Sequence, residues 1–385
     1  MALKIGKAAA APPFLAMDVI AAANARAAML PPGVPGIIHM EVGQPGTGAP
    51  KGAVQAVEAA LRSGAPLGYT EAFGRRSLRE RIAAHYQEWY GLALPASRMA
   101  VTVGASGGFP LAFLAAFDPG DRVALTAPFY PPYVNILTAL GIEPVIIEAG
   151  ADTRFQPSVA LLERIDPAPD GLIVASPSNP AGTMLHPDEL AAIAAWCDRR
   201  GVRLISDEIY HGLNYDSPIA TAAAFSPHAV VVNSFSKYFS MTGWRIGWLV
   251  LPEDLVRPVE CLAQNLFISP PHISQVAAEA AFGCHDELRA NVARYRRSRD
   301  HLLRTLPLAG FDRLSPAEGA FYLYADLAGR SNDSVAFCAR MLEEVGIAAT
   351  PGVDFDRSRG HRFVRFSYCG PEADMREAAE RLHGR

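Results

Sequence analysis

The chain has 385 residues, of which half are hydrophobic and 19% charged, so it can form one large and one smaller globular domain. Its net charge of -4 argues against binding to nucleic acid or to anionic membranes. Its five cysteines are odd in number and form no CxxC pair, which argues against both a disulfide framework and a zinc site. We therefore predict no metal and a reducing compartment.

The N-terminal segment has features of both a signal peptide and a helix. Lys4 and Lys7 precede small and apolar residues, but two prolines and Asp18 interrupt the apolar stretch. From Phe14 to Ile20 apolar residues recur every three or four positions, which favours an amphipathic helix. No apolar run approaches the ~18 residues of a membrane span. The sequence thus predicts a cytoplasmic protein without a membrane partner.

The middle of the chain alternates short β-rich runs with helical stretches rich in Ala and Leu. Most of these runs are continuously apolar, which is typical of strands buried on both faces of a largely parallel sheet. Such a sheet binds its ligand beyond the carboxyl ends of its strands. We predict seven strands, at 99–104, 122–127, 143–149, 171–176, 203–208, 229–234 and 246–251.

The pattern changes after Ser274, where a long helical stretch rich in Ala and Arg runs to about Leu306. Strand-like and helical segments follow in turn, which indicates a smaller α+β unit. We expect the N-terminal helix to pack on this unit. The predicted fold class is α/β, with a large domain at 46–275 and a small domain made of 1–45 and 276–385.

Three strand ends carry motifs that are weak one by one. Ala105 and Ser106 lie in GASGG, which could bring backbone N–H groups to a phosphate at a helix N-terminus. Tyr130 lies in APFYPPY and could stack on a planar ring, and Asn179 in SPSNPAG would place an amide at the same sheet edge. Each motif alone is more typical of an ordinary turn or loop.

A fourth strand ends in SDEIYHG. An acid after a buried strand is often only a helix cap. Asp207, however, could keep the nitrogen of a pyridine ring protonated, because an opposite charge favours the charged form. Tyr210 could then donate a hydrogen bond to the ring's phenolate oxygen.

The most specific signal is NSFSKYFSMTGWRIGW, which follows the fifth of these strand ends. Lys237 can form an imine with an aldehyde, whereas an isolated lysine is usually a solvated surface charge. Ser234, Ser236 and Arg245 can hydrogen-bond and neutralise a phosphate dianion. Together the five strand ends supply the groups that an aldehyde cofactor carrying a phosphate requires.

These motifs resemble the fold-type-I pyridoxal-phosphate enzymes, specifically the class I/II aminotransferases of the aspartate aminotransferase superfamily. The resemblance spans nearly the whole chain, from IIHMEVGQP through GYTEAFGRRSLRERIA to RFVRFSYC. It implies a large domain with a mainly parallel seven-stranded sheet and a homodimer with active sites at the subunit interface. The chain departs from the family pattern at Gln44, Gly107 and Asp356, which leaves the substrate open but removes no catalytic group.

The resemblance also implies a role for each site residue. Lys237, Asp207 and Tyr130 are the catalytic candidates, and Gly43, Asn179 and Arg365 are the candidates for substrate binding. Tyr69 resembles the tyrosine that reaches the cofactor phosphate of the neighbouring subunit. The predicted set of pyridoxal 5'-phosphate contacts is Ala105, Ser106, Tyr130, Asn179, Asp207, Tyr210, Ser234, Ser236, Lys237, Arg245 and Tyr69.

The expected reaction moves an amino group between an amino acid and a 2-oxo acid by a ping-pong mechanism. A lyase, a cyclising synthase or a decarboxylase on the same scaffold would share these active-site residues. A cofactor-sensing regulator would need a basic helix-turn-helix extension, and a dinucleotide oxidoreductase would need a glycine fingerprint that is missing. The segment PLAFLAAF carries no basic residue, which favours a neutral, hydrophobic or aromatic substrate side chain.

Overall fold

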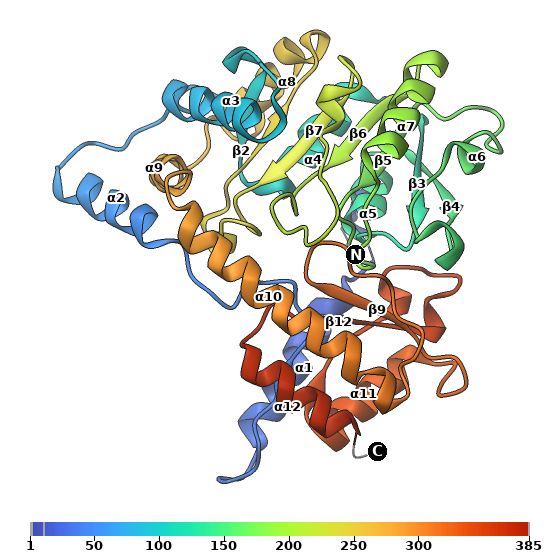
Figure 1. Cartoon of the computed structure of the whole chain (residues 1–385). Helices are drawn as coiled ribbons and strands as arrows, with labels where there is room; N and C mark the ends of the chain where they lie inside the picture. Colours follow the sequence, from blue (N-terminus) through green and yellow to red (C-terminus); the bar gives the residue numbers. More distant parts are fainter. Residues whose placement is uncertain (1–2, 11, 384–385) are drawn as a thin grey trace.

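A computed structural model describes residues 3–10 and 12–383. A seven-stranded sheet lies at the centre of the larger part, in the order β2-β8-β7-β6-β5-β3-β4 (Figure 1). Strands β3 to β7 are parallel to their neighbours in that group, whereas β8 is antiparallel to both β7 and β2. The mainly parallel sheet predicted from the sequence is therefore confirmed.

All seven predicted strands are present, and their ends differ from the expected positions by at most two residues. Their bounds are β2 Met99–Thr102, β3 Arg122–Ala127, β4 Glu143–Glu148, β5 Gly171–Ala175, β6 Arg203–Asp207, β7 Val230–Ser234 and β8 Gly247–Val250.

Helices cover both faces of this sheet and make up much of the smaller part. They are α1 Leu15–Met29, α2 Lys51–Arg62, α3 Arg76–Tyr90, α4 Gly104–Ala116, α5 Pro132–Ala139, α6 Val159–Leu162, α7 Pro187–Arg200, α8 Glu253–Leu266, α9 His272–Ala281, α10 His285–Thr305, α11 Ser334–Val345 and α12 Glu372–His383.

The sheet is buried because alternate residues of each strand belong to two different cores. Ile173 and Ile205 pack with α4, α5 and α8, whereas Leu172 and Leu204 pack in the core that contains residues of α3 and α7. Since both faces are covered, the strands need apolar residues at every position. This explains the continuously apolar runs in the sequence.

The long helical stretch expected after Ser274 is two helices. Helix α9 ends at Ala281, and α10 begins at His285. Phe282 and Gly283 form the turn between them, and Phe282 is buried in the core that contains residues of α3 and α7. Helix α9 packs on α2, and α10 continues to the lower part of the molecule, where it packs on α12 (Figure 1).

The smaller part contains two small sheets. Strands β11 (Thr350–Pro351), β12 (Phe363–Ser367) and β9 (Tyr322–Asp326) form an antiparallel sheet. Strand β1 (Ile38–His39) pairs in parallel with β10 (Ile347–Ala348), so the N-terminal segment joins the C-terminal unit. Helix α1 packs on the same unit, as expected. The predicted domain bounds, 46–275 for the large domain and 1–45 with 276–385 for the small domain, stay a prediction.

Within residues 3–10 and 12–383, no helix combines the length and the apolar character that crossing a membrane would require.

Candidate active site

A cavity lies at the carboxyl ends of the parallel strands. Strands β5 and β6 reach it through Ala175 and Asp207, and the C-terminal unit reaches it through Tyr322 and Arg365. The cavity brings together seven of the predicted site residues, namely Gly43, Tyr130, Asn179, Asp207, Tyr210, Lys237 and Arg365.

Lys237 follows the end of β7 and extends into this cavity. Its Nζ donates a hydrogen bond of 2.6 Å to the backbone oxygen of Gly43. Burial lowers the pKa of Lys237 to about 8, because a charged amine is poorly solvated there. A larger share of the amine is therefore neutral, and hence nucleophilic, near neutral pH than in an exposed lysine.

Asp207 is the last residue of β6 and is only 3% exposed. Its Oδ2 accepts a short hydrogen bond from the hydroxyl of Tyr133, and its Oδ1 accepts one of 3.1 Å from the backbone N–H of Ile209. Burial raises the pKa of Asp207 to about 6, although both hydrogen bonds and Lys237 act in the opposite direction. A cationic group bound beside Asp207 would favour its ionised form.

Two tyrosine hydroxyls meet in the same cavity. The hydroxyls of Tyr210 and Tyr322 lie 2.8 Å apart. A Cβ atom at Gly43 would lie 1.7 Å from the Tyr322 hydroxyl, so only glycine leaves room for this pair. Tyr130 also lines the cavity, and its ring stands edge-on to Phe14 and to Tyr133.

Arg365 lies in the centre of β12 and is 2% exposed. Its Nη1 donates to Oδ1 of Asn179 at 2.7 Å, and its Nη2 donates to Oγ1 of Thr350 at 3.1 Å and to the backbone oxygen of Glu41. Each of these partners is uncharged at the contacting atom, so the arginine keeps its positive charge available for an anion in the cavity.

A second group of predicted residues lies around the N-terminus of α4. The hydroxyl of Ser234 donates to Oγ of Ser236 at 2.9 Å. A Cβ atom at Gly104 would lie 2.5 Å from Nη2 of Arg245, and one at Gly247 would lie 2.9 Å from the backbone nitrogen of Ala105. Glycines thus let a guanidinium and backbone amides approach one another closely, and Ser106 lies exposed on the first turn of this helix.

These groups fit pyridoxal phosphate. The amides at the start of α4, the two serine hydroxyls and Arg245 form a donor set suited to a phosphate dianion. Lys237 would offer a buried amine to the aldehyde, and Asp207 would offer a buried carboxylate to a ring nitrogen that carries positive charge.

Tyr69 lies away from the cavity that Lys237 lines. It is 84% exposed and lies on the segment between α2 and α3. Helix α2 and this segment project from the body of the molecule (Figure 1). Tyr69 is therefore not part of the cavity of its own chain.

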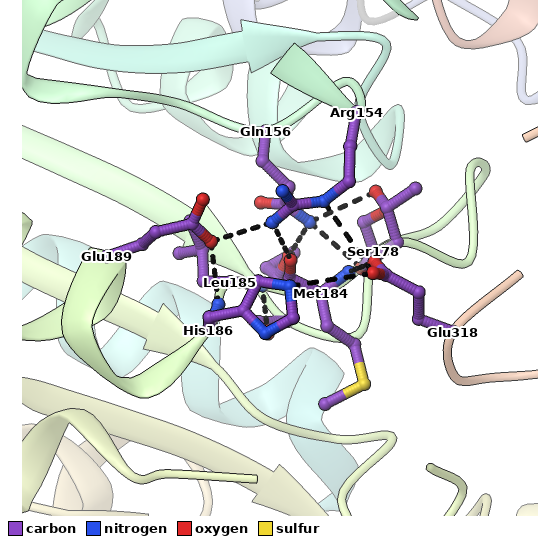
Figure 2. Close-up of polar contacts among 11 residues, drawn as sticks. Arg154, Gln156, Ser178, Met184, Leu185, His186, Glu189 and Glu318 are labelled. Carbon is purple, nitrogen blue, oxygen red and sulfur yellow. Dashed lines mark hydrogen bonds and ion pairs between the residues drawn. The ribbon is translucent and has the colours of Figure 1, made fainter. Parts of the chain in front are cut away.

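The loop that carries Asn179 is fixed by a polar network (Figure 2). Glu318, which precedes β9, accepts a hydrogen bond of 2.8 Å from the backbone N–H of Met184. Its other oxygen lies 3.6 Å from Nε of Arg154 and 3.7 Å from Nε2 of His186. The network thus joins the loop after β5 to the C-terminal unit.

Sequence reasoning missed several residues of the cavity. Tyr133 lies in the same APFYPPY motif as Tyr130, three residues later, so the motif itself could have revealed it. Tyr322 lies in GAFYLYADL, one of the strand-like segments expected after Leu306. No sequence pattern indicated that Glu41 and residues of α1 line the cavity, because they reach it only through long-range packing.

The fold and the site define an enzyme that binds pyridoxal phosphate at the end of a parallel sheet. Residues 35–382 match the family model for aminotransferase class I and II. The chain is 50% identical to valine–pyruvate aminotransferase of Mycobacterium tuberculosis over 378 residues, which cover 97% of this chain and 96% of that protein. It is 33% identical to aspartate/prephenate aminotransferase of Thermus thermophilus over 352 residues, 90% of each chain.

Solved structures give the same result. An aminotransferase from Mycobacterium tuberculosis matches with a TM-score of 0.97 and 48% identity, over 100% of this chain and 99% of that chain. The aspartate aminotransferase of Thermus thermophilus with maleate matches with a TM-score of 0.92 and 30% identity, over 100% of both chains. The chain belongs to the class I and II aminotransferases. It is an enzyme that transfers an amino group between an amino acid and a 2-oxo acid, with pyridoxal 5'-phosphate as its cofactor.

Proposed function

We propose that this aminotransferase acts on amino acids with a neutral side chain and on the corresponding 2-oxo acids, in a ping-pong reaction. The observation that carries the proposal is the charge of the cavity wall. Among the described residues that line it, the basic side chains are Lys237 and Arg365. Since Lys237 is assigned to the cofactor aldehyde and Arg365 to the α-carboxylate, neither remains for a second carboxylate.

The side of the cavity formed by α1 supports this proposal. Ala16, Met17 and Ile20 of α1 line the cavity, together with Phe14 just before the helix. An aliphatic side chain gains about 25 cal/mol per Å² of apolar surface buried against such a wall. The 50% identical relative bears the name valine–pyruvate aminotransferase, which agrees with a small neutral donor. Relatives named aspartate aminotransferase are less similar, at about 30% identity.

In the proposed reaction, each charged residue handles one part of the chemistry. Bound pyridoxal phosphate supplies an electron-accepting ring that stabilises negative charge on the substrate α-carbon. Arg365 orients the substrate through its carboxylate, and Lys237 removes the α-proton as a general base and later returns a proton. Asp207 would hold positive charge at the ring nitrogen of the bound cofactor, while Asn179 and Tyr210, which line the same cavity, would donate hydrogen bonds to its ring oxygen.

A substrate panel tests the proposal. Purified holoenzyme is mixed with one amino acid at a time, and the spectral change of the cofactor gives kcat/KM for the half-reaction. We expect valine, alanine or leucine to react at least about tenfold more efficiently than aspartate or glutamate. Initial-rate plots with both substrates varied should give parallel lines. A clear preference for aspartate would refute the substrate proposal.

We further propose a homodimer in which Tyr69 of each subunit reaches the phosphate region of the other. Apolar side chains exposed near Tyr69 support this proposal, since Thr70 contacts Ser269 and the residues just before Ser269 include exposed Phe267 and Ile268. Subunits carrying Tyr69→Phe are mixed with subunits carrying Lys237→Ala. Sedimentation then measures the oligomeric state, and the activity of the mixture tests whether the site is shared between subunits.

We also propose a cytoplasmic location. The five cysteines are free, which agrees with a reducing compartment. Localisation of the tagged chain in its host cell would test this.

A further inference from the structure

The turn that follows β4 has an unfavourable backbone conformation that the reaction described above does not explain. Arg154 and Phe155 have φ angles of 54° and 59°, which lie in the left-handed region that glycine favours. Phe155 is also buried, so a bulky side chain is fixed in this conformation. Strained backbone persists only where surrounding contacts hold it, and it is concentrated at functional sites. The contacts of this turn therefore indicate what the strain serves.

The side chains of this turn contact the loop after β5, which carries Asn179. Figure 2 shows the polar contacts that Arg154 and Gln156 make with this loop. Gln156 is buried, and its Nε2 donates hydrogen bonds of 2.9 Å to the backbone oxygen of Thr183 and of 3.2 Å to that of Ala175. Because Ala175 precedes Asn179 and Thr183 follows it, one amide group fixes the distance between the two ends of the loop.

The two residues before Gln156 hold the same loop. Nη2 of Arg154 donates a hydrogen bond of 3.1 Å to the backbone oxygen of Met184. Phe155 packs with Ala181 in a small hydrophobic core. Three successive side chains thus fix the loop near its start, in its middle and at its end, while the backbone is left-handed at the first two of them.

Asn179 is the residue through which this loop reaches the active-site cavity. It is buried and lines the cavity, and its Oδ1 accepts a hydrogen bond of 2.7 Å from Nη1 of Arg365. The loop also lies tightly against the C-terminal unit, since a Cβ atom at Gly182 would lie 2.7 Å from the backbone oxygen of Tyr322. A shift of the loop would therefore move the amide of Asn179 and weaken one of the hydrogen bonds that orient Arg365.

We propose that Gln156 is a positioning residue, which sets the place of Asn179 and thereby the orientation of Arg365. Arg154 and Phe155 assist it by holding the same loop. This inference rests on the proposed assignment of Arg365 to the substrate carboxylate. A bidentate pair between a guanidinium and a carboxylate depends on geometry, so small displacements of the groups that hold it are costly. Gln156 therefore affects substrate binding although it is not among the residues that line the cavity.

A purely structural role for Gln156 is the competing explanation, because a buried amide that holds a loop also stabilises the fold. The substitution Gln156→Met separates the two roles, since methionine has a similar length but no N–H donor. A structural role would lower thermal stability and weaken the binding of cofactor and substrate alike. The proposed role weakens the binding of the carboxylate and leaves the affinity for the cofactor, whose phosphate donors lie around α4, nearly unchanged.

The experiment titrates the holoenzyme with a carboxylate that cannot react and follows the absorbance of the cofactor. The probe is 3-methylbutanoate or maleate, whichever the wild-type enzyme binds more tightly. We expect Gln156→Met to raise the Kd of the probe by about five- to tenfold, whereas the Kd of the cofactor changes by less than about twofold. Hydrogen exchange should become faster at the backbone amides of 176–184.

Ser226→Ala is the matched control. Ser226 is buried and donates a hydrogen bond of 2.7 Å to Oδ1 of Asp198. It lies before the start of β7, at the edge of the sheet opposite to the cavity. This variant should lose stability, as Gln156→Met does, but keep the wild-type Kd for the probe and for the cofactor.

An unchanged Kd for the probe in Gln156→Met, or an equal loss of affinity for probe and cofactor, would overturn the proposal. Should that variant fail to fold, Arg154→Met decides instead, because it removes only the contact of a partly exposed side chain with Met184 and the neighbouring acids. We then expect the Kd of the probe to rise about threefold, and no rise would contradict the proposal. Arg365→Lys tests the underlying assignment separately, since unchanged probe binding in that variant would refute the role of Arg365 itself.

Discussion

The two walls of the active-site cavity are built in different ways. The cofactor wall takes Asn179, Asp207 and Lys237 from points at or just beyond the ends of three strands of one sheet. The substrate wall takes Glu41, Arg365 and residues of α1 from segments that lie far apart in the sequence. A sheet edge gathers its residues by local strand geometry, whereas the substrate wall exists only after the N-terminal segment has packed on the C-terminal unit.

The walls also differ in how they use polar groups. Burial shifts the pKa values of Asp207 and Lys237 on the cofactor wall toward the neutral range. On the substrate wall, Arg365 is held by a backbone oxygen, an amide oxygen and a hydroxyl. The cofactor wall is thus adapted to move protons, and the substrate wall to hold an anion in one orientation.

The largest expected effect is on the cofactor wall. Lys237→Ala should lower turnover by about 10⁴-fold or more, because it removes both the covalent attachment and the general base. Turnover and borohydride reduction of the holoenzyme measure these two losses. Lys51→Ala is the matched control, since Lys51 is an exposed lysine at the start of α2. An active Lys237→Ala enzyme would contradict the assignment.

On the substrate wall, Arg365→Lys should raise KM for the amino acid by about 100-fold, because a lysine cannot form a bidentate pair with the carboxylate. The cofactor spectrum should stay unchanged, which would separate the two walls. Arg362→Lys is the control, since Arg362 lies just before β12 and pairs with Asp326 outside the cavity. Loss of cofactor from Arg365→Lys would show that the walls are not independent.

The lowered pKa of Lys237 predicts a pH dependence for the cofactor wall. Below pH 8 the amine is mainly protonated, so capture of pyridoxal phosphate by the apo-protein should slow by about tenfold per pH unit. Above the pKa of about 8 the rate should level off. Stopped-flow absorbance measures this curve. An inflection near the ordinary lysine value would mean that burial does not tune this amine.

The smallest effect concerns Tyr133, which supports the cofactor wall from behind Asp207. Tyr133→Phe removes one hydrogen bond to the carboxylate and should lower kcat by about five- to tenfold while KM changes little. Tyr324→Phe is a suitable control, because its hydroxyl is buried with no hydrogen-bond partner among residues 3–10 and 12–383, and Tyr324 does not line the active-site cavity. Equal effects from both substitutions would indicate a general packing defect.

The difference between the walls also explains what could be predicted from the sequence. Lys237, Asp207 and Asn179 each follow a recognisable apolar strand, so their convergence at one sheet edge could be inferred. Glu41 and Met17 could not be assigned to the cavity, because no local pattern shows which residues of α1 and of the segment after β1 face it once these segments pack on the C-terminal unit. Nor does the sequence show that Asp354 accepts hydrogen bonds from the N–H groups of Leu15 and Ala16, which fixes the start of that helix over the cavity.

Glu318 links the two walls and is not among the residues that line the cavity. It is bound to the backbone of Met184 on the Asn179 loop and lies beside Arg154 and His186 (Figure 2). Chimeras that exchange the C-terminal unit with that of a relative must therefore also exchange the residues that meet position 318. A mismatched residue at that contact would shift the loop that carries Asn179, and the enzyme would then lose rate with all substrates alike.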